Sequence, residues 1–513
     1  MDVMLPCPLL AGRLEPARDA SCYNRCMTDR PVRTRYAPSP TGEPHLGNIR
    51  TALYDWLLAR HYGGQFILRI EDTDQQRYAE GGVEALFSAL RWLGLEWDEG
   101  PDLGGPYGPY VQSERLDLYN SYTDRLLAQD NAYQCYCSPE RLAEVRKQQQ
   151  ARKEPPRYDR HCRDLTPEQR AEAEASGVAP VVRFKTPLTG ETFAHDVLRG
   201  DIVFKNETLD DFVLMKSDGY PTYHLAAVVD DHLMEITHVI RSDEWLPSAP
   251  RHFLVYQAFG WEPPLIAHVS RVLGPDKTKL SKRHGAHSVL DYREQGFLPD
   301  AVINSLALLG WSLDDHTEII DRQTLVQHFD LDRVLPNPAI FDQDKLLWMN
   351  GMYIRQMPPE TLAGMLRPYL EDALSTRIDK ALLLSIIPLV RERIRLLPEI
   401  VDIADFFFTD GPLDYNADTL LGKRFAGKPG EAAAALERVV AAAEGIADWT
   451  HEALESVIRP LAEELGMKAG DLFGLVRVAV TGKTATPPLF ETMEVLGRET
   501  TIARLRAALE KLG

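Results

Sequence analysis

The chain has 513 residues and carries 57 Lys and Arg against 76 Asp and Glu, a formal net charge of −19. At roughly 100–200 residues per domain this length predicts three or four domains, and 44% hydrophobic and 26% charged residues are typical of a globular protein. A collagen-like, largely disordered or disulfide-dense chain is excluded, and the lack of an apolar run of about 18 residues predicts no membrane partner. The negative charge argues only against indiscriminate binding of polyanions.

The first 30 residues are expected to form a disordered extension. Their apolar stretch, 4–11, is short and broken by Pro6 and Pro8, so no signal peptide is predicted. Met27 is a candidate start of translation because the first strand pattern begins just after it. Six cysteines in so long a chain indicate reduced thiols and a cytoplasmic location.

Strand and helix patterns alternate after residue 30. A buried strand over 32–36, a helix over 47–62 with apolar residues at helical spacing, and a second strand over 66–70 form a parallel crossover unit. A further helix is expected over 79–93, and strand-like runs return at 181–184 and 212–215. The crossover pattern resumes at 237–241 and continues through 267–273. We therefore predict an α/β fold in which a Rossmann-like, doubly wound parallel sheet is split by an α+β insertion and followed by an all-α C-terminal region.

This pattern divides the chain into six expected segments. They are 1–30, the extension; 31–116 and 228–294, the two halves of the Rossmann-like domain; 117–227, the insertion; 295–358, a connecting helical domain; and 359–513, the all-helical region.

The motif His45-Leu46-Gly47-Asn48 follows the first strand and opens the first helix. The free N–H groups and positive dipole end of a helix N-terminus bind phosphate. Gly47 lets a nucleotide approach the backbone, and His45 and Asn48 can donate hydrogen bonds. Taken alone, the motif is equally that of a loop histidine before a helix-start glycine.

A second motif, 276–283, reads Asp-Lys-Thr-Lys-Leu-Ser-Lys-Arg and follows Gly274-Pro275. Lysines on a loop can follow the phosphate charge that develops in a transition state, although an isolated basic run is more often a solvated turn. In a doubly wound sheet both motifs lie at the carboxyl ends of strands, where nucleotides bind. The pair therefore favours an ATP site.

The two motifs resemble the signatures of class I aminoacyl-tRNA synthetases, with His45–Asn48 as the His-x-Gly-His type and Lys279–Arg283 as the Lys-Met-Ser-Lys-Ser type. The stretches 35–42, 69–74, 218–225 and 241–245 resemble the bacterial glutamyl-tRNA synthetase subgroup. The resemblance runs from about 32 to 351 and is weaker beyond. It implies that the chain activates glutamate with ATP and Mg²⁺ and transfers it to the 3′ end of tRNA(Glu).

The resemblance also implies roles for particular side chains. The expected catalytic residues are His45, Asn48, Lys279, Ser281 and Lys282. The expected glutamate-binding residues are Arg35, Ala37, Ser39, Glu71, Tyr223 and Arg241. The expected ATP-binding residues are His45, Gly47, Asn48, Glu244, Lys279, Leu280 and Lys282. A substrate with two carboxylates and one amine needs cations and an acceptor, which Arg35, Arg241 and Glu71 supply.

Three positions weaken or modify this pattern. The resemblance places Glu244 near the nucleotide, but a position without contact to the nucleotide is an equally good interpretation of this residue. Ala227 stands where some members have Asn, so one polar contact is expected to be missing. Leu280 stands where the signature has Met, a change that the subgroup accepts.

A cysteine constellation, Cys135-x-Cys137 and Tyr158-x-x-x-Cys162, suggests one structural Zn²⁺, which prefers four tetrahedral ligands. Some relatives complete such a site with a His two residues after the last Cys or a Tyr four residues before it; here those places hold Asp164 and Tyr158. His161 is a further candidate, and we prefer Tyr158. The alternative is a group of buried free thiols.

The resemblance assigns the insertion to the tRNA acceptor end and the helical region to the anticodon. Arg146–Arg163, with seven basic and two acidic residues, suits phosphate contacts. Arg393 matches the place where discriminating members read the last anticodon base; the alternative is an enzyme that also charges tRNA(Gln). We expect a monomer.

Other classes of protein remain as alternatives. A non-catalytic tRNA-binding paralogue would have lost His45 or the lysine loop, and both are present. A smaller relative that glutamylates a modified tRNA base would lack the helical region. A small-molecule nucleotidyltransferase would need neither that region nor the insertion.

Overall fold

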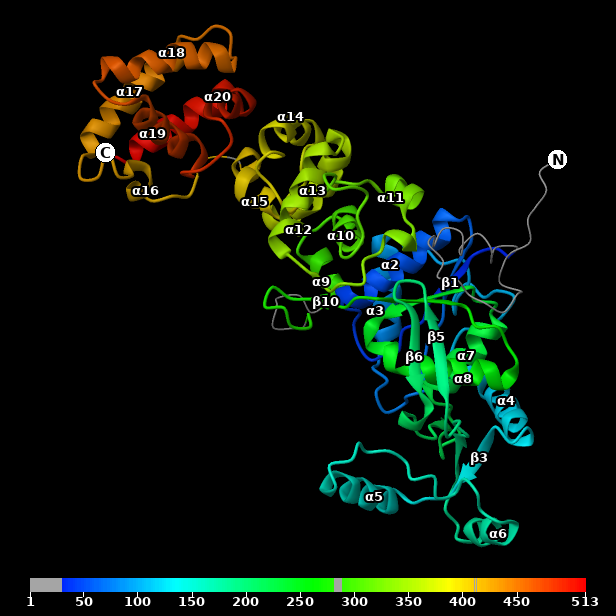
Figure 1. The fold of residues 1–513 in the computed structure, drawn as a ribbon. Coiled ribbons are helices and arrows are strands. Elements are labelled where there is room, and N and C mark those ends of the chain that lie inside the picture. The colour runs from blue at the N-terminus through cyan, green and yellow to red at the C-terminus, as the bar shows by residue number, and fades with distance from the viewer. Residues whose placement is uncertain (1–29, 281–287, 410, 412) are drawn as a thin grey trace, which may run out of the picture. The chain divides into compact units, whose positions relative to one another are not determined.

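The computed structural model describes residues 30–280, 288–409, 411 and 413–513 (Figure 1). The predictions for residues 1–29, and those for Ser281 and Lys282, lie outside the described residues. The chain divides into two compact units. Of the described residues, the first holds those of 30–293 together with 302–342, and the second holds those of 294–301 together with 343–513.

A four-stranded parallel sheet with the order β2-β1-β8-β9 forms the centre of the first unit. The chain moves outward from β1 to β2 and from β8 to β9, so the strand order reverses between β1 and β8. The predicted doubly wound parallel sheet is confirmed. Its strands are β1 (Arg33–Tyr36), β2 (Gln65–Leu68), β8 (His238–Ser242) and β9 (Leu265–Val269).

Local sequence explains how β1 connects to β2. Helix α2 (Leu46–His61) is mostly buried, and its buried residues include the charged side chains of Arg50 and Asp55. The chain then turns back beside β1 at Gly64, where a Cβ atom would lie 2.0 Å from the carbonyl oxygen of Val32. Only glycine permits that approach.

Two predicted elements differ from the observed ones. The strand expected over 267–273 is two strands, because β9 ends at Val269 and β10 (Val272–Leu273) pairs instead with β11 (Ala339–Ile340). The helix expected from residue 79 begins later, as α3 (Gly82–Leu93), after Gly81 in a left-handed conformation. Both differences arise from pairing or turn geometry that hydrophobic periodicity does not report.

The insertion combines strands and helices, as predicted. It contains a three-stranded antiparallel sheet, β3-β4-β7, and a separate hairpin, β5-β6. The strands are β3 (Ala132–Cys135), β4 (Val181–Phe184), β5 (Glu191–Asp196), β6 (Gly200–Lys205) and β7 (Val213–Met215). The helices from here to the end of the first unit are α4 (Leu116–Ala128), α5 (Pro139–Ala151), α6 (Pro167–Ala175), α7 (Tyr223–Leu233), α8 (Ala249–Phe259), α9 (Val289–Glu294), α10 (Pro299–Ala307) and α11 (Arg322–His328).

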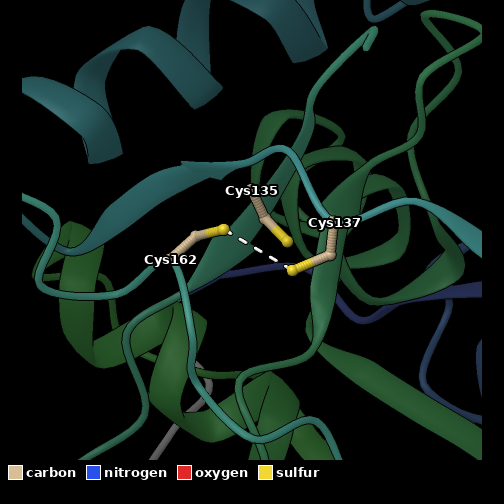
Figure 2. Close-up of side chains that lie close together, drawn as sticks. All are labelled: Cys135, Cys137 and Cys162. Carbon is tan, nitrogen blue, oxygen red and sulfur yellow. Dashed lines mark hydrogen bonds between the residues drawn. The ribbon is translucent and has the colours of Figure 1, made fainter. Parts of the chain in front are cut away.

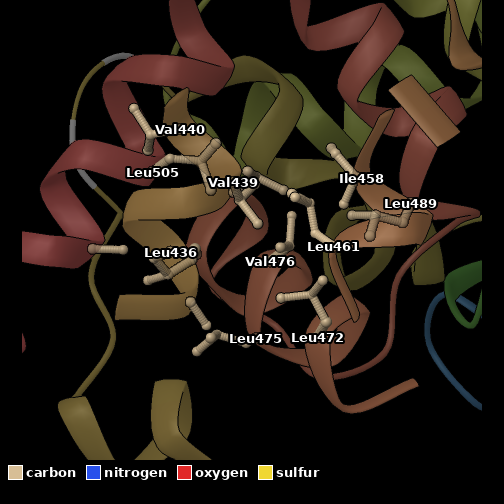
Figure 3. Packing of buried hydrophobic residues seen from close by; sticks show 14 of the residues in the cluster. Leu436, Val439, Val440, Ile458, Leu461, Leu472, Leu475, Val476, Leu489 and Leu505 are labelled. Carbon is tan, nitrogen blue, oxygen red and sulfur yellow. The ribbon is translucent and has the colours of Figure 1, made fainter. Parts of the chain in front are cut away.

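The second unit confirms the all-α prediction, since its described residues form helices and turns without a strand. Figure 3 shows its apolar core, in which Leu436, Val439, Leu472 and Val476 interdigitate. The helices are α12 (Gln343–Gln356), α13 (Pro359–Leu374), α14 (Lys380–Val390), α15 (Glu399–Ala404), α16 (Ala417–Leu421), α17 (Pro429–Glu444), α18 (His451–Glu464), α19 (Ala469–Thr481) and α20 (Leu489–Glu510). Among the described residues of both units, none of the helices is long and apolar enough to cross a membrane.

Candidate active site

A cavity of about 630 Å³ lies at the carboxyl ends of β1 and β8, where the strand order reverses. Residues from β1, α2, the loop after β2, the start of α7 and the end of β8 line it. The structure brings six predicted glutamate-binding residues together in its wall: Arg35, Ala37, Ser39, Glu71, Tyr223 and Arg241. Asn48 also lines this cavity.

Arg241, near the end of β8, is held by neighbouring side chains. Its Nε donates to Nε2 of His268 at 2.9 Å, and one Nη donates to the Tyr223 hydroxyl at 2.9 Å. The other Nη is buried without a hydrogen-bond partner, and Arg241 forms no ion pair with any residue that the structure describes. Because a buried guanidinium without a counter-charge is costly, the site is complementary to an anion.

Arg35, in β1, belongs to a buried ionic network. Its Nε donates to Asp231 at 3.0 Å, and Asp231 also accepts from Arg69 at 2.8 Å. Arg69 in turn donates to Glu71 at 2.9 Å. Burial raises the pKa of Glu71, although the charges of Arg69 and Arg35 act in the opposite direction. A cation and an acceptor are thus fixed on one wall of the cavity.

Sequence reasoning missed Asp55 and Trp245 in the cavity wall. Asp55 is fully buried on α2, and its two carboxyl oxygens lack hydrogen-bond partners. Burial raises the pKa of Asp55 well above its usual range. Its only sequence signal is a lone charge among the apolar residues 52–59. Trp245 packs its ring 4.6 Å from that of Tyr223, and its side chain is partly exposed.

The phosphate motif caps helix α2. His45 is the N-cap residue, and its Nδ1 accepts from the backbone N–H of Asn48 at 3.3 Å. In the neutral ring the proton is then on Nε2, which can donate to an anion. Desolvation and the Lys279 ammonium lower the pKa of His45. A Cβ atom on Gly47 would lie 3.2 Å from Nδ1 of His45, so a side chain there would crowd the ring.

The described part of the lysine loop lies close to this cap. Lys279 forms an ion pair with Glu244 at 2.8 Å, and the Leu280 N–H donates to the carbonyl of Val272 at 3.2 Å. His45, Gly47, Glu244, Lys279 and Leu280 do not line the cavity that holds the six predicted glutamate-binding residues. Because of its ion pair with Lys279, Glu244 lies beside a lysine that is predicted to bind the nucleotide.

Three cysteine side chains of the insertion point toward one another (Figure 2). The sulfur atoms of Cys135, Cys137 and Cys162 all lie within 4.8 Å of each other, and those of Cys137 and Cys162 are 3.6 Å apart. The Tyr158 hydroxyl lies 3.3 Å from the sulfur of Cys135 and 3.6 Å from the sulfur of Cys137. Asp164 is exposed and is not part of this group.

The predicted basic stretch is only partly available to a phosphate. Arg160 and Arg163 form ion pairs with the buried Asp211 at 3.2 and 2.9 Å, and Arg157 donates to the carbonyl of Glu207. The four remaining basic residues are exposed: Arg146, Lys147, Arg152 and Lys153.

In the second unit, Arg393 is exposed just after α14. Burial and the charge of Arg393 lower the pKa of Arg477, a residue of α19, so the two cations lie near each other.

Residues 31–348 match the family described as "tRNA synthetases class I (E and Q), catalytic domain", and residues 361–509 match an "Anticodon binding domain". A glutamate–tRNA ligase from Dehalococcoides mccartyi (strain 195) is 50% identical over 485 residues, which are 94% of this chain and 98% of that protein. The chain belongs to the glutamate–tRNA ligase family. It is accordingly an ATP-dependent aminoacyl-tRNA synthetase.

Other glutamate–tRNA ligases agree over the same length. The ligase from Moorella thermoacetica is 47% identical over 483 residues, 93% of this chain and 98% of its own. The crystal structure of a glutamate tRNA ligase from Elizabethkingia meningosepticum, in complex with its amino acid, superposes with a TM-score of 0.86 at 37% identity, covering 94% of this chain and all of that one. The predicted family, fold and enzyme class are confirmed.

Proposed function

We propose that this glutamate–tRNA ligase holds glutamate in the cavity between β1 and β8. Arg35 and Arg241 bind its carboxylates, Ser39 donates a hydrogen bond and Glu71 accepts from its ammonium. The observation that carries this assignment is that Arg241, a buried cation of the cavity wall, has no counter-ion among the residues that the structure describes. An anionic ligand would supply the counter-charge that Arg241 lacks.

Activation follows from this placement. A carboxylate oxygen of glutamate forms a bond to the α-phosphorus of ATP, and the bond to pyrophosphate breaks. His45 would donate through Nε2 to a phosphate oxygen, and Lys279 and Lys282 would stabilise the developing charge. Mg²⁺ bound with ATP supplies further charge neutralisation. A ribose hydroxyl at the tRNA 3′ end then takes the glutamyl group, and AMP leaves.

For tRNA we propose that residues 117–227 contact the acceptor end and 359–513 the anticodon of tRNA(Glu), with the enzyme acting as a cytoplasmic monomer. The exposed basic residues of 146–153 would contact phosphates. Arg393 would read the last anticodon base, with the charge of Arg477 adding to the attraction for the anticodon.

Replacing Arg393 with glutamine is expected to relax this reading. Loss of a bidentate contact to a base costs about 1–3 kcal/mol, so glutamylation of tRNA(Gln) relative to tRNA(Glu) should rise about tenfold. The measurement is kcat/KM for both tRNAs with labelled glutamate. Arg391→Gln in the same turn is the control. A wild-type enzyme that charges both tRNAs equally well would show that it is non-discriminating.

We also propose that the cysteine cluster holds one structural Zn²⁺ with Tyr158 as the fourth ligand. Tetrahedral zinc with Zn–S bonds of about 2.3 Å separates its sulfur ligands by about 3.8 Å. The 3.6 Å between Cys137 and Cys162 suits that geometry, as does the buried Tyr158 hydroxyl beside two sulfurs.

Metal analysis tests the zinc site. We expect about one zinc per wild-type chain, a loss of zinc in Cys162→Ala, and zinc affinity at least about tenfold weaker in Tyr158→Phe. Phenylalanine keeps the ring that lies under the Arg183 guanidinium, so only the oxygen ligand is removed. Asp164→Asn should bind zinc like the wild type. Zinc-free wild-type protein would show instead a cluster of buried thiols.

A further inference from the structure

A hydrogen-bonded chain of three buried side chains connects the insertion to the glutamate cavity. Asp196, the last residue of β5, accepts from Nδ1 of His268 at 2.6 Å. His268, in β9, accepts from Nε of Arg241 through Nε2 at 2.9 Å. Asp196 is 2% exposed and His268 is 1% exposed, so neither can exchange its partner for water.

The surroundings of Asp196 decide the protonation of the ring. Its Oδ1 accepts from the backbone N–H groups of Leu198 and Arg199, and its Oδ2 accepts from the backbone N–H of His268 as well as from the ring. All of these are donors, so the carboxylate acts only as an acceptor. Nδ1 therefore carries the ring proton, and Nε2 has the lone pair that Arg241 requires.

A charged ring would break this arrangement. An Nε2–H on His268 would oppose the Nε–H of Arg241, which is also a donor. Burial lowers the pKa of His268 against the effect of Asp196, which agrees with a neutral ring. His252 approaches Arg241 from another side, with Nδ1 3.2 Å from Nη1, and burial lowers its pKa well below the usual range. Arg241 thus lies among neutral acceptors.

We propose that Asp196 and His268 are positioning residues for glutamate. Asp196 selects the His268 tautomer, and His268 holds the guanidinium of Arg241 in the wall of the cavity. The inference rests on the proposed role of Arg241 in binding glutamate. It makes the affinity for glutamate depend on a residue of the insertion hairpin, β5-β6, which contributes no residue to the wall of the cavity.

A purely structural role is the competing explanation. Asp196 also caps the turn at 198–199, and the neighbouring Val197 N–H donates to the carbonyl of Ile266 at 2.8 Å, which attaches β5 to β9. If these residues served only to attach β5 to β9, their replacement would lower stability, and glutamine and asparagine at position 268 would have the same effect. The two roles therefore separate in a matched pair of variants.

The pair is His268→Gln and His268→Asn. The glutamine carbonyl oxygen reaches the place of Nε2 and can accept from Arg241, whereas the asparagine amide reaches only the place of Nδ1 and can donate to Asp196. We expect His268→Asn to raise the KM for glutamate in ATP–pyrophosphate exchange with tRNA present by about 10- to 100-fold, the effect of losing a hydrogen bond to a charged group. His268→Gln should stay within about threefold of the wild type, and both should keep the KM for ATP.

Asp196→Asn tests the tautomer directly. Its amide NH₂ facing Nδ1 would force the ring proton onto Nε2, so the KM for glutamate should rise as in His268→Asn. His195→Asn, in the same strand but half-exposed and paired with Asp201, is the control without effect. The ¹⁵N shifts of the imidazole in the unmodified enzyme give a readout that does not depend on any variant folding, and they should show Nδ1–H and an unprotonated Nε2.

Each contrary result has a distinct meaning. Equal glutamate KM values for His268→Asn and His268→Gln, or an Nε2–H tautomer or imidazolium near pH 7, would overturn the positioning role. If Arg241→Met also leaves the KM for glutamate unchanged, the proposed glutamate site is itself wrong. A rise in KM for Arg241→Met alone would retain that site and reject only the chain through His268 and Asp196.

Discussion

Replacement of Arg241 by methionine should raise the KM for glutamate by about 100-fold or more and leave the KM for ATP almost unchanged. Methionine fills much of the same volume but lacks the charge and the donors. The bound carboxylate would then be buried without its partner, which costs about 2–5 kcal/mol. Wild-type Arg241 lines the cavity and has no counter-ion among the described residues, so the loss falls on the ligand and not on an internal ion pair.

Steady-state ATP–pyrophosphate exchange with tRNA present, over a range of glutamate concentrations, measures this effect. Arg91→Met is the control, because Arg91 is an exposed arginine that pairs with Asp102 and lies outside the cavity. Unfolding midpoints of both variants show whether the fold is retained. An unchanged KM for glutamate in a folded Arg241→Met enzyme would remove Arg241 from the substrate site.

Replacement of Lys282 by alanine is expected to lower the rate of glutamyl-adenylate formation by about 10²- to 10³-fold while barely changing the affinity for glutamate. A group that stabilises charge only in the transition state affects kcat and leaves ground-state binding intact. Lys282 follows Lys279 by three residues in the signature, and Lys279 already has Glu244 as a counter-ion. Because Glu244 already balances the charge of Lys279, we expect Lys282 to supply the positive charge that stabilises the transition state.

Single-turnover and steady-state exchange separate the two parameters for Lys282→Ala. Lys277→Ala is the control, since Lys277 is an exposed cation of the same turn that is not assigned to ATP. An effect confined to the KM for glutamate, or equal losses in both variants, would show that Lys282 has no special role in activation.

Local patterns predicted much of the fold and part of the site. Strand β4 was predicted at its observed bounds, and the phosphate motif was placed correctly at the N-terminus of α2, because strands and helix caps depend on residues a few positions apart. The sequence did not predict how the chain divides between the two units near residue 300. Residues 294–301 pack with the second unit while 302–342 return to the first, which depends on contacts distant in sequence.

The sequence by itself determined which groups are present: a histidine–glycine motif at the start of a helix, two arginines and a glutamate proposed to bind the amino acid, and a cysteine group in the insertion. Only the tertiary structure decided how those groups are held. Asp196 and His268 are 72 residues apart and His268 and Arg241 are 27 apart, so no spacing in the sequence predicts the hydrogen-bonded chain that joins them. Burial then excludes water, so the tautomer of His268 decides whether the Nε–H of Arg241 finds an acceptor.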